Sequence, residues 1–97
     1  MLSAALSIPD PHDSRVATYT YRADVLRELE RHGVRPTGET SPQLVRDYVR
    51  DLYKYEIRQL RARMLGDEFP RAEYSARVEA LRNRYRVLSL LPRQFVE

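Results

Sequence analysis

Residues 41–66 have the sequence SPQLVRDYVRDLYKYEIRQLRARMLG, and this stretch decides the fold. Ser41 is a residue type that caps helix N-termini, and Pro42 suits the first helical position, where its missing N–H costs nothing. From Gln43 to Leu65 there is neither Gly nor Pro, which predicts one helix over residues 42–65 that ends at Gly66. At a rise of 1.5 Å per residue this helix is a rod about 36 Å long. So long a rod needs packing partners along its whole length.

The apolar stripe of this rod changes face halfway along. At 100° per residue, the residues of the first half share one face and those of the second half share another, turned by about a fifth of a revolution. The first set is Val45, Val49 and Leu52, and the second is Tyr53, Ile57, Leu60 and Met64. We expect the first half to pack on a helix that precedes the rod and the second half on a helix that follows it.

Two shorter helices are predicted around the rod. The first covers residues 20–32, with Val25, Leu29 and His32 on one face and Gly33 as its left-handed stop. The other covers residues 70–87, with an apolar stripe at steps of four and three that comprises Tyr74, Val78, Leu81, Tyr85 and Leu88. Residues 1–18 contain two prolines and no periodicity, which predicts a flexible or extended arm. The apolar tail after Leu88 is expected to lie extended and docked. The predicted fold is an all-α, three-helix domain over residues 19–97.

Length and composition limit the class of protein. A chain of 97 residues holds one domain, and so short a chain builds a thin core. It has no cysteine, which excludes disulfides and thiolate metal sites. It has no apolar run of 18 residues, and its first residues lack the basic start of a secretion signal. We therefore expect a cytoplasmic protein that does not enter a membrane.

Residues 57–82, IRQLRARMLGDEFPRAEYSARVEALR, resemble the short C-terminal domain (SHOCT) family. In that family a Leu-rich helix, a Gly, a turn and an acidic-aromatic helix start form a small hairpin. The likeness covers about a quarter of the chain and is carried by Leu60, Leu65, Gly66, Phe69, Glu73, Tyr74 and Leu81. Where that family usually has Ser, Thr or Asp as the second helix cap, this chain has Pro70. The resemblance implies an oligomerisation or interaction module.

A line of basic residues runs along the rod at steps of four, four, four and three: Arg46, Arg50, Lys54, Arg58 and Arg61. One interpretation is the solvated face of an amphipathic helix, and the other is a surface for phosphates or for an acidic protein. Sixteen of the seventeen basic residues are Arg, which suits bidentate pairing with carboxylate or phosphate, although a GC-rich genome also favours Arg. The net charge is only +3. Tyr48 and Tyr55 are candidates for base stacking, but they point about 120° away from the basic line, which weakens a nucleic-acid site.

Glu56 falls inside the apolar sector of the rod, with Arg63 on the same line. A carboxylate in such a place needs a partner, because its desolvation is costly. The alternatives are an ion pair with an arginine of a neighbouring helix and an ion pair across a subunit interface.

Other functional classes lack their signals. No nucleophile–base pair, GxSxG, HExxH or phosphate-binding Gly-rich loop occurs, so we expect no enzyme and no cofactor. Asp10, His12 and Asp13 superficially resemble metal ligands, but three candidates on one arm without a second cluster make a poor site, and we expect no metal.

The leading hypothesis is a protein-interaction or assembly module that self-associates, with a dimer favoured. The reason for this hypothesis is uncovered apolar surface. The rod presents more apolar area than two shorter helices can cover, and a dimer can bury the remainder. Tyr and Arg, both frequent here, are enriched at interface hot spots, which makes Tyr48, Tyr55 and Arg63 candidate interface residues. Glu56 is a further candidate, because its carboxylate could form an ion pair across the interface. The second hypothesis is nucleic-acid binding by the basic line.

Overall fold

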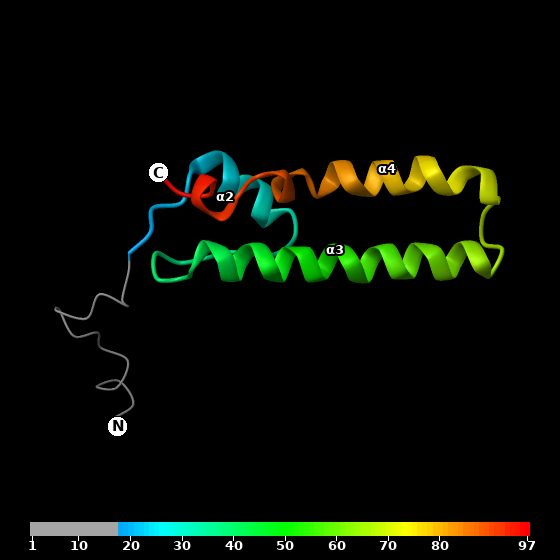
Figure 1. Cartoon of the computed structure of the whole chain (residues 1–97), viewed down its shortest axis with the longest axis horizontal. Helices are drawn as coiled ribbons and strands as arrows, with labels where there is room; N and C mark the ends of the chain where they lie inside the picture. The colour runs from blue at the N-terminus through cyan, green and yellow to red at the C-terminus, as the bar shows by residue number, and fades with distance from the viewer. Residues whose placement is uncertain (1–17) are drawn as a thin grey trace, which may run out of the picture.

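The long helix forms the axis of the molecule, and the other elements lie along one side of it (Figure 1). In this computed structural model, which describes residues 18–97, the helices are α2 (Ala23–Glu30), α3 (Pro42–Leu65) and α4 (Tyr74–Arg84). Three 3₁₀ turns complete the chain: η1 (Arg71–Glu73), η2 (Arg86–Ser89) and η3 (Pro92–Gln94). Over the described residues the domain is all-α, as predicted, with one isolated bridge between Tyr21 and Val96. The predicted arm at residues 1–18 and the ligand candidates Asp10, His12 and Asp13 lie outside the described residues, apart from Thr18.

Helix α3 is unbroken and has the predicted bounds. Pro42 takes the first helical position, and the Ser41 carbonyl accepts the first helical hydrogen bond, from Val45 N–H at 3.0 Å. The Ser41 side chain makes no capping hydrogen bond, so Ser41 occupies the capping position without acting through its hydroxyl.

Two helices end in the same hydrogen-bonded motif with different residues at its left-handed position. After α2, Gly33 has φ 75°, and Val34 N–H donates back to the Leu29 carbonyl at 3.0 Å. After α3, Asp67 has φ 61°, and Glu68 N–H donates to the Arg63 carbonyl at 2.9 Å. Both are Schellman motifs, which satisfy the free carbonyls of a helix end. The sequence therefore located the end of α3 correctly at Gly66, but the left-handed residue is the next one, Asp67.

Helix α4 turns back along α3 to form a hairpin and is shorter than predicted. The prediction of one helix over residues 70–87 is wrong at both ends. Residues 71–73 form a 3₁₀ turn, and the α-helix stops at Tyr85, whose φ of −110° and ψ of 30° leave the helical region. The change of direction there places Val87 in the core and lets Arg86 reach Glu28 at 2.9 Å.

Helix α2 is also shorter than the predicted range 20–32, because the tail takes the backbone groups of residues 20–22. Arg22 N–H donates to the Phe95 carbonyl, and Glu97 N–H donates to the Thr20 carbonyl, both at 2.9 Å. The tail is docked as expected but is folded into turns rather than extended. Figure 1 shows it lying against α2 at one end of the long helix.

The hydrophobic core has a thick and a thin part. We call the thick part the base, which consists of α2, the first half of α3 and the tail; its most deeply buried side chains are Val25, Leu29, Val49 and Phe95. We call the thin part the arm, which is the second half of α3 with α4; it encloses Leu60, Met64, Phe69 and Leu81. The backbone segments nearest the first half of α3 are η2 and η3, whereas α2 packs on η2 and adds Val25 and Leu29 to the same core, so the tail takes much of the role that the sequence assigned to α2 alone.

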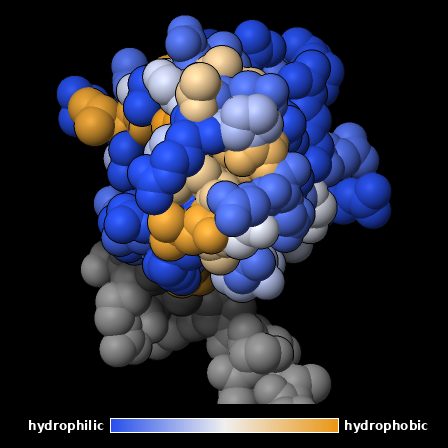
Figure 2. Space-filling model, turned by 90° about the vertical axis from the view of Figure 1, so that its right-hand side faces the viewer, coloured by the Kyte–Doolittle hydropathy of each residue, from blue (hydrophilic) through white to orange (hydrophobic). Residues whose placement is uncertain are grey.

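Polar side chains dominate the surface at the end of the arm. In Figure 2, which looks onto that end, hydrophilic residues surround small hydrophobic areas.

Among residues 18–97, no helix has the length and apolarity that crossing a bilayer requires.

Candidate functional site: the outer face of α3

Four apolar side chains line the face of α3 that its own chain leaves open. Leu44, Tyr48 and Tyr55 are 64%, 55% and 56% exposed, and Leu52 between them is half-buried. Because each residue advances 100° around the helix, these four side chains fall within about 80° of one another. We call Leu44, Tyr48, Leu52 and Tyr55 the outer stripe. Isolated exposed apolar residues are ordinary, whereas a continuous row of large ones is typical of a binding surface.

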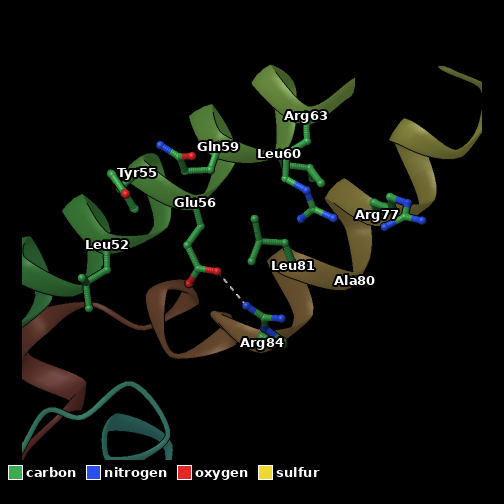
Figure 3. Close-up of a pocket in the computed structure, with 10 residues that line it drawn as sticks. All are labelled: Leu52, Tyr55, Glu56, Gln59, Leu60, Arg63, Arg77, Ala80, Leu81 and Arg84. Atoms are coloured by element: carbon green, nitrogen blue, oxygen red, sulfur yellow. Dashed lines mark hydrogen bonds and ion pairs between the residues drawn. The ribbon is translucent and has the colours of Figure 1, made fainter. Parts of the chain in front are cut away.

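The outer stripe runs through two open grooves. Along the arm, a groove of about 610 Å³ lies between α3 and α4, with Leu52 and Tyr55 on one wall and Ala80 on the other (Figure 3). Along the base, a groove of about 360 Å³ lies between α3 and the preceding loop, with Leu44 and Tyr48 on its wall. We call these the arm groove and the base groove. The stripe thus joins two hollows on one side of the molecule.

Every arginine that lines the arm groove is paired with a carboxylate. Arg84 reaches Glu56 at 2.8 Å, as Figure 3 shows. The other two pairs are Arg63 with Glu68 at 3.1 Å and Arg77 with Glu73 at 3.0 Å. The guanidinium of Arg77 also lies over the Phe69 ring, 4.1 Å from its centroid. The groove therefore carries balanced charge, which does not select a polyanion.

Glu56 joins the arm to the base. Besides Arg84, its carboxylate accepts a hydrogen bond from the hydroxyl of Tyr85. Burial and this hydrogen bond raise the pKa of Tyr85 above its usual value, because both disfavour the phenolate. The Tyr85 ring stacks on His32 at a centroid distance of 4.1 Å, and His32 Nε2–H donates to the Arg84 carbonyl at 2.8 Å. The sequence placed His32 on the apolar face of its helix, and in the structure its ring packs there against Tyr85.

The two sequence alternatives for Glu56 are now resolved within the chain. Its partner is Arg84 of the neighbouring helix, and Arg63 pairs with Glu68 instead. Glu56 and Arg63 border the arm groove, but neither has a charge that lacks a partner. Their place is at the edge of the candidate site rather than at its centre.

The basic line of α3 divides into two parts. Arg46 turns into the protein, where its Nε and one Nη donate to the Leu90 and Leu88 carbonyls, each at 2.8 Å. It is a clamp for the tail, so the prediction that it belongs to a phosphate surface is wrong for this residue. Arg50 lies 3.3 Å from Asp47 and 3.9 Å from Asp51. Lys54, Arg58 and Arg61 are exposed and form no ion pair within the described part of the chain.

Leu44, Tyr48 and Tyr55 lie on a different face of α3 from the apolar stripe that the sequence predicted to need cover. Val45, Val49, Leu60 and Met64 are buried within the chain, because the tail adds Val87 and Phe95 to the cover that the two shorter helices provide. The other members of that predicted stripe, Leu52, Tyr53 and Ile57, are half-buried and pack against the same core. Sequence reasoning missed Leu44 and the alignment of Leu52 with Tyr48 and Tyr55. The signal was present, since positions 44, 48, 52 and 55 follow the helical steps of four and three.

Residues 18–97 contain no group of His, Asp and Glu side chains placed to hold a metal ion.

No family model, no curated protein and no solved structure matches the chain. The resemblance of residues 57–82 to the SHOCT family stays a prediction. Of the residues that carry it, Leu60, Phe69 and Leu81 are buried between the helices of the arm, whereas Leu65 is exposed.

Proposed function

We propose that the protein is a non-catalytic assembly module that binds a second copy of itself through the outer stripe of α3. The observation that carries this proposal is the row of Leu44, Tyr48, Leu52 and Tyr55, in which three large apolar side chains are more than half exposed and the fourth, Leu52, is half-buried. Tyrosine is among the residues that contribute most at protein interfaces, because it buries a large rigid ring and keeps a polar end. Balanced charge in the arm groove suits a partner with the same balanced surface.

The test is the molar mass of the full chain in solution, measured by light scattering and sedimentation at micromolar concentration. We expect a dimer for the wild type. The double substitution Tyr48→Ala with Tyr55→Ala removes two anchor rings from each subunit and should weaken the dimer on the order of 1000-fold, since the dimer loses four rings at about 1 kcal/mol each. Both sites are exposed helix positions where alanine is favourable, so the fold should persist, as circular dichroism will report.

Leu65→Ala is the matched control. Leu65 lies on the same helix and is 54% exposed, but it falls outside the outer stripe. This variant should dimerise like the wild type. A wild-type chain that stays monomeric up to its solubility limit would overturn the proposal, as would equal weakening by both variants.

Nucleic-acid binding is the second candidate, and the side of the arm opposite the arm groove favours it. On α3, Arg61 lies about 100° from Leu60, away from the groove-lining Gln59, and on α4 Arg82 lies about 100° from Leu81, away from Ala80. Arg61 and Arg82 therefore share that side with Lys54. None of these three cations has an ion-pair partner among residues 18–97. Cations without carboxylate partners remain available to phosphates.

This candidate predicts binding that weakens steeply with salt. Fluorescence anisotropy with labelled single-stranded RNA and duplex DNA should show affinity at low ionic strength, with a slope set by the number of phosphates contacted. The pair Arg61→Glu with Arg82→Glu should abolish it, whereas Arg77→Glu on the groove side should have a smaller effect. Absence of binding at low salt would end this candidate.

A further inference from the structure

The outer stripe is bordered by a row of charges whose order along α3 matters. Asp47, Asp51, Lys54 and Arg58 fall within about 60° of one another around the helix, next to the outer stripe. We call these four residues the charge row. Its two acids come first in the chain and its two bases follow. Asp51 is 71% exposed, and Lys54 and Arg58 are also exposed, so the row faces solvent.

The charge row is only partly neutralised within the chain. Among residues 18–97, Arg50 is the one cation that pairs with its acids, and it serves two carboxylates, at 3.3 Å from Asp47 and 3.9 Å from Asp51. One guanidinium therefore faces two negative charges. Over the described residues, Lys54 and Arg58 have no carboxylate partner. The row is left negative at its first half and positive at its second half.

From this order we infer that two copies pair through α3 in antiparallel orientation, about a two-fold axis near Leu52; this inference rests on the self-association proposed above. In a parallel pair the two-fold axis would run along the helices and place the two charge rows on opposite flanks of the interface, where neither row would meet the other. In an antiparallel pair the first half of each row meets the second half of the other. Electrostatic complementarity of this kind fixes orientation and register.

An axis near Leu52 also aligns the apolar residues. Tyr48 precedes Leu52 by four residues and Tyr55 follows it by three, so each Tyr48 lies opposite Tyr55 of the partner subunit. On the charge row, Asp51 then lies opposite Lys54 of the partner subunit, and Asp47 lies opposite Arg58 of the partner subunit. The rings and the charges therefore select the same register to within about one residue, which is less than one helical turn. Two independent sets of side chains agree on one geometry.

A charge-swap experiment with the full-length chain tests this arrangement. The basic variant carries Asp47→Lys and Asp51→Lys, and the acidic variant carries Lys54→Glu and Arg58→Glu. Each variant alone presents like charges along the whole row, so its homodimer should be weakened about tenfold or more. An equimolar mixture should restore a dimer that contains one chain of each kind. Native mass spectrometry identifies that heterodimer directly, and circular dichroism with thermal unfolding verifies that each variant is folded.

The outcomes separate this inference from the function on which it rests. A wild-type dimer together with variants that homodimerise normally, or a mixture that forms no heterodimer, overturns the antiparallel arrangement and leaves self-association standing. A monomeric wild type overturns both. A parallel arrangement gives the first of these patterns, because the two charge rows would then lie on opposite flanks of the interface: both variants should homodimerise like the wild type, and the mixture should gain nothing over the homodimers.

Discussion

The base and the arm enclose their cores in different ways. In the base, α2, α3 and the tail converge on side chains that lose all contact with water, such as Leu29, Val49 and Phe95, each 0% exposed. In the arm only α3 and α4 face each other, and its best-buried residues, Leu60, Phe69 and Leu81, keep 7% exposure. Two helices cannot surround a side chain, whereas three segments can. The base is therefore the source of stability, and the arm is a projecting element with open sides.

The comparison is tested most strongly by one phenylalanine from each region. Phe95→Ala in the base should cost about 3–5 kcal/mol, because a completely buried ring leaves a cavity that its surroundings cannot fill. Phe69→Ala at the end of the arm should cost about 2–3 kcal/mol, since water can reach the site when the ring is removed. Urea unfolding gives both values. Equal losses would contradict the division into a stable base and a thin arm.

Removal of the tail clamp should produce the next largest effect. Arg46→Ala leaves the Leu88 and Leu90 carbonyls without their donors, at a cost of about 1–3 kcal/mol. Arg46→Lys should recover part of the loss, because an ammonium group cannot span both carbonyls as a planar guanidinium does. Arg58→Ala, an exposed arginine on the same helix, is the control and should change the free energy of unfolding by less than about 0.5 kcal/mol. If Arg46→Ala behaves like Arg58→Ala, the clamp has no energetic role.

The junction between the two regions should respond to high pH. The unfolded chain releases its tyrosine protons near pH 10, while folded Tyr85 holds its proton longer because its pKa is raised. Above pH 10 the native state thus binds more protons than the unfolded state, so stability falls as the pH increases. Burial, with Tyr19 nearby, raises the pKa of Tyr21 in the base as well, which acts in the same direction.

Glu56→Gln isolates the contribution of the junction. It removes the negative charge beside Tyr85 but not the burial, so the phenolate of Tyr85 should appear at lower pH than in the wild type and still above pH 10. Phenolate absorbance during a pH titration measures this change. Glu73→Gln, on the arm but without contact to Tyr85, should leave the titration unaltered. Wild-type Tyr85 that loses its proton near pH 10, the ordinary value for tyrosine, would contradict the account.

The smallest changes in the free energy of unfolding are expected at the left-handed residues after α2 and α3, and they should have opposite signs. Gly33→Ala forces a side chain into a left-handed conformation with open space around it, and should cost about 1 kcal/mol from backbone strain alone. Asp67→Gly relieves the same conformation at the end of α3 and should stabilise by about 0.5–1 kcal/mol. Thermal unfolding resolves the two directions. Changes of the same sign would show that the two helix ends are not equivalent.

The arm was more predictable from the sequence than the base. Gly66 and the helical spacing of Leu60, Val78 and Leu81 are local signals, and the hairpin follows from them. The bridge between Tyr21 and Val96 and the clamp between Arg46 and the tail join residues far apart in the chain, which no local pattern reveals. In the outer stripe, Tyr48 and Tyr55 are residues that the sequence also proposed for an interface, and that proposal stays a prediction. Arg46 was misassigned, because its direction depends on where the tail docks.

Self-association through α3 is tested most directly by the distance between the two arm tips. The chain has no cysteine, so Ala72→Cys at the exposed tip provides a single site for a spin label. Leu52 is 13 residues from Leu65, and in an antiparallel pair the tips point in opposite directions, about 40 Å apart at 1.5 Å per residue. Double electron–electron resonance should show one distance near this value. Tips within about 20 Å, the spacing of neighbouring helices plus the labels, would contradict the antiparallel arrangement, and the absence of any dipolar coupling would contradict assembly itself.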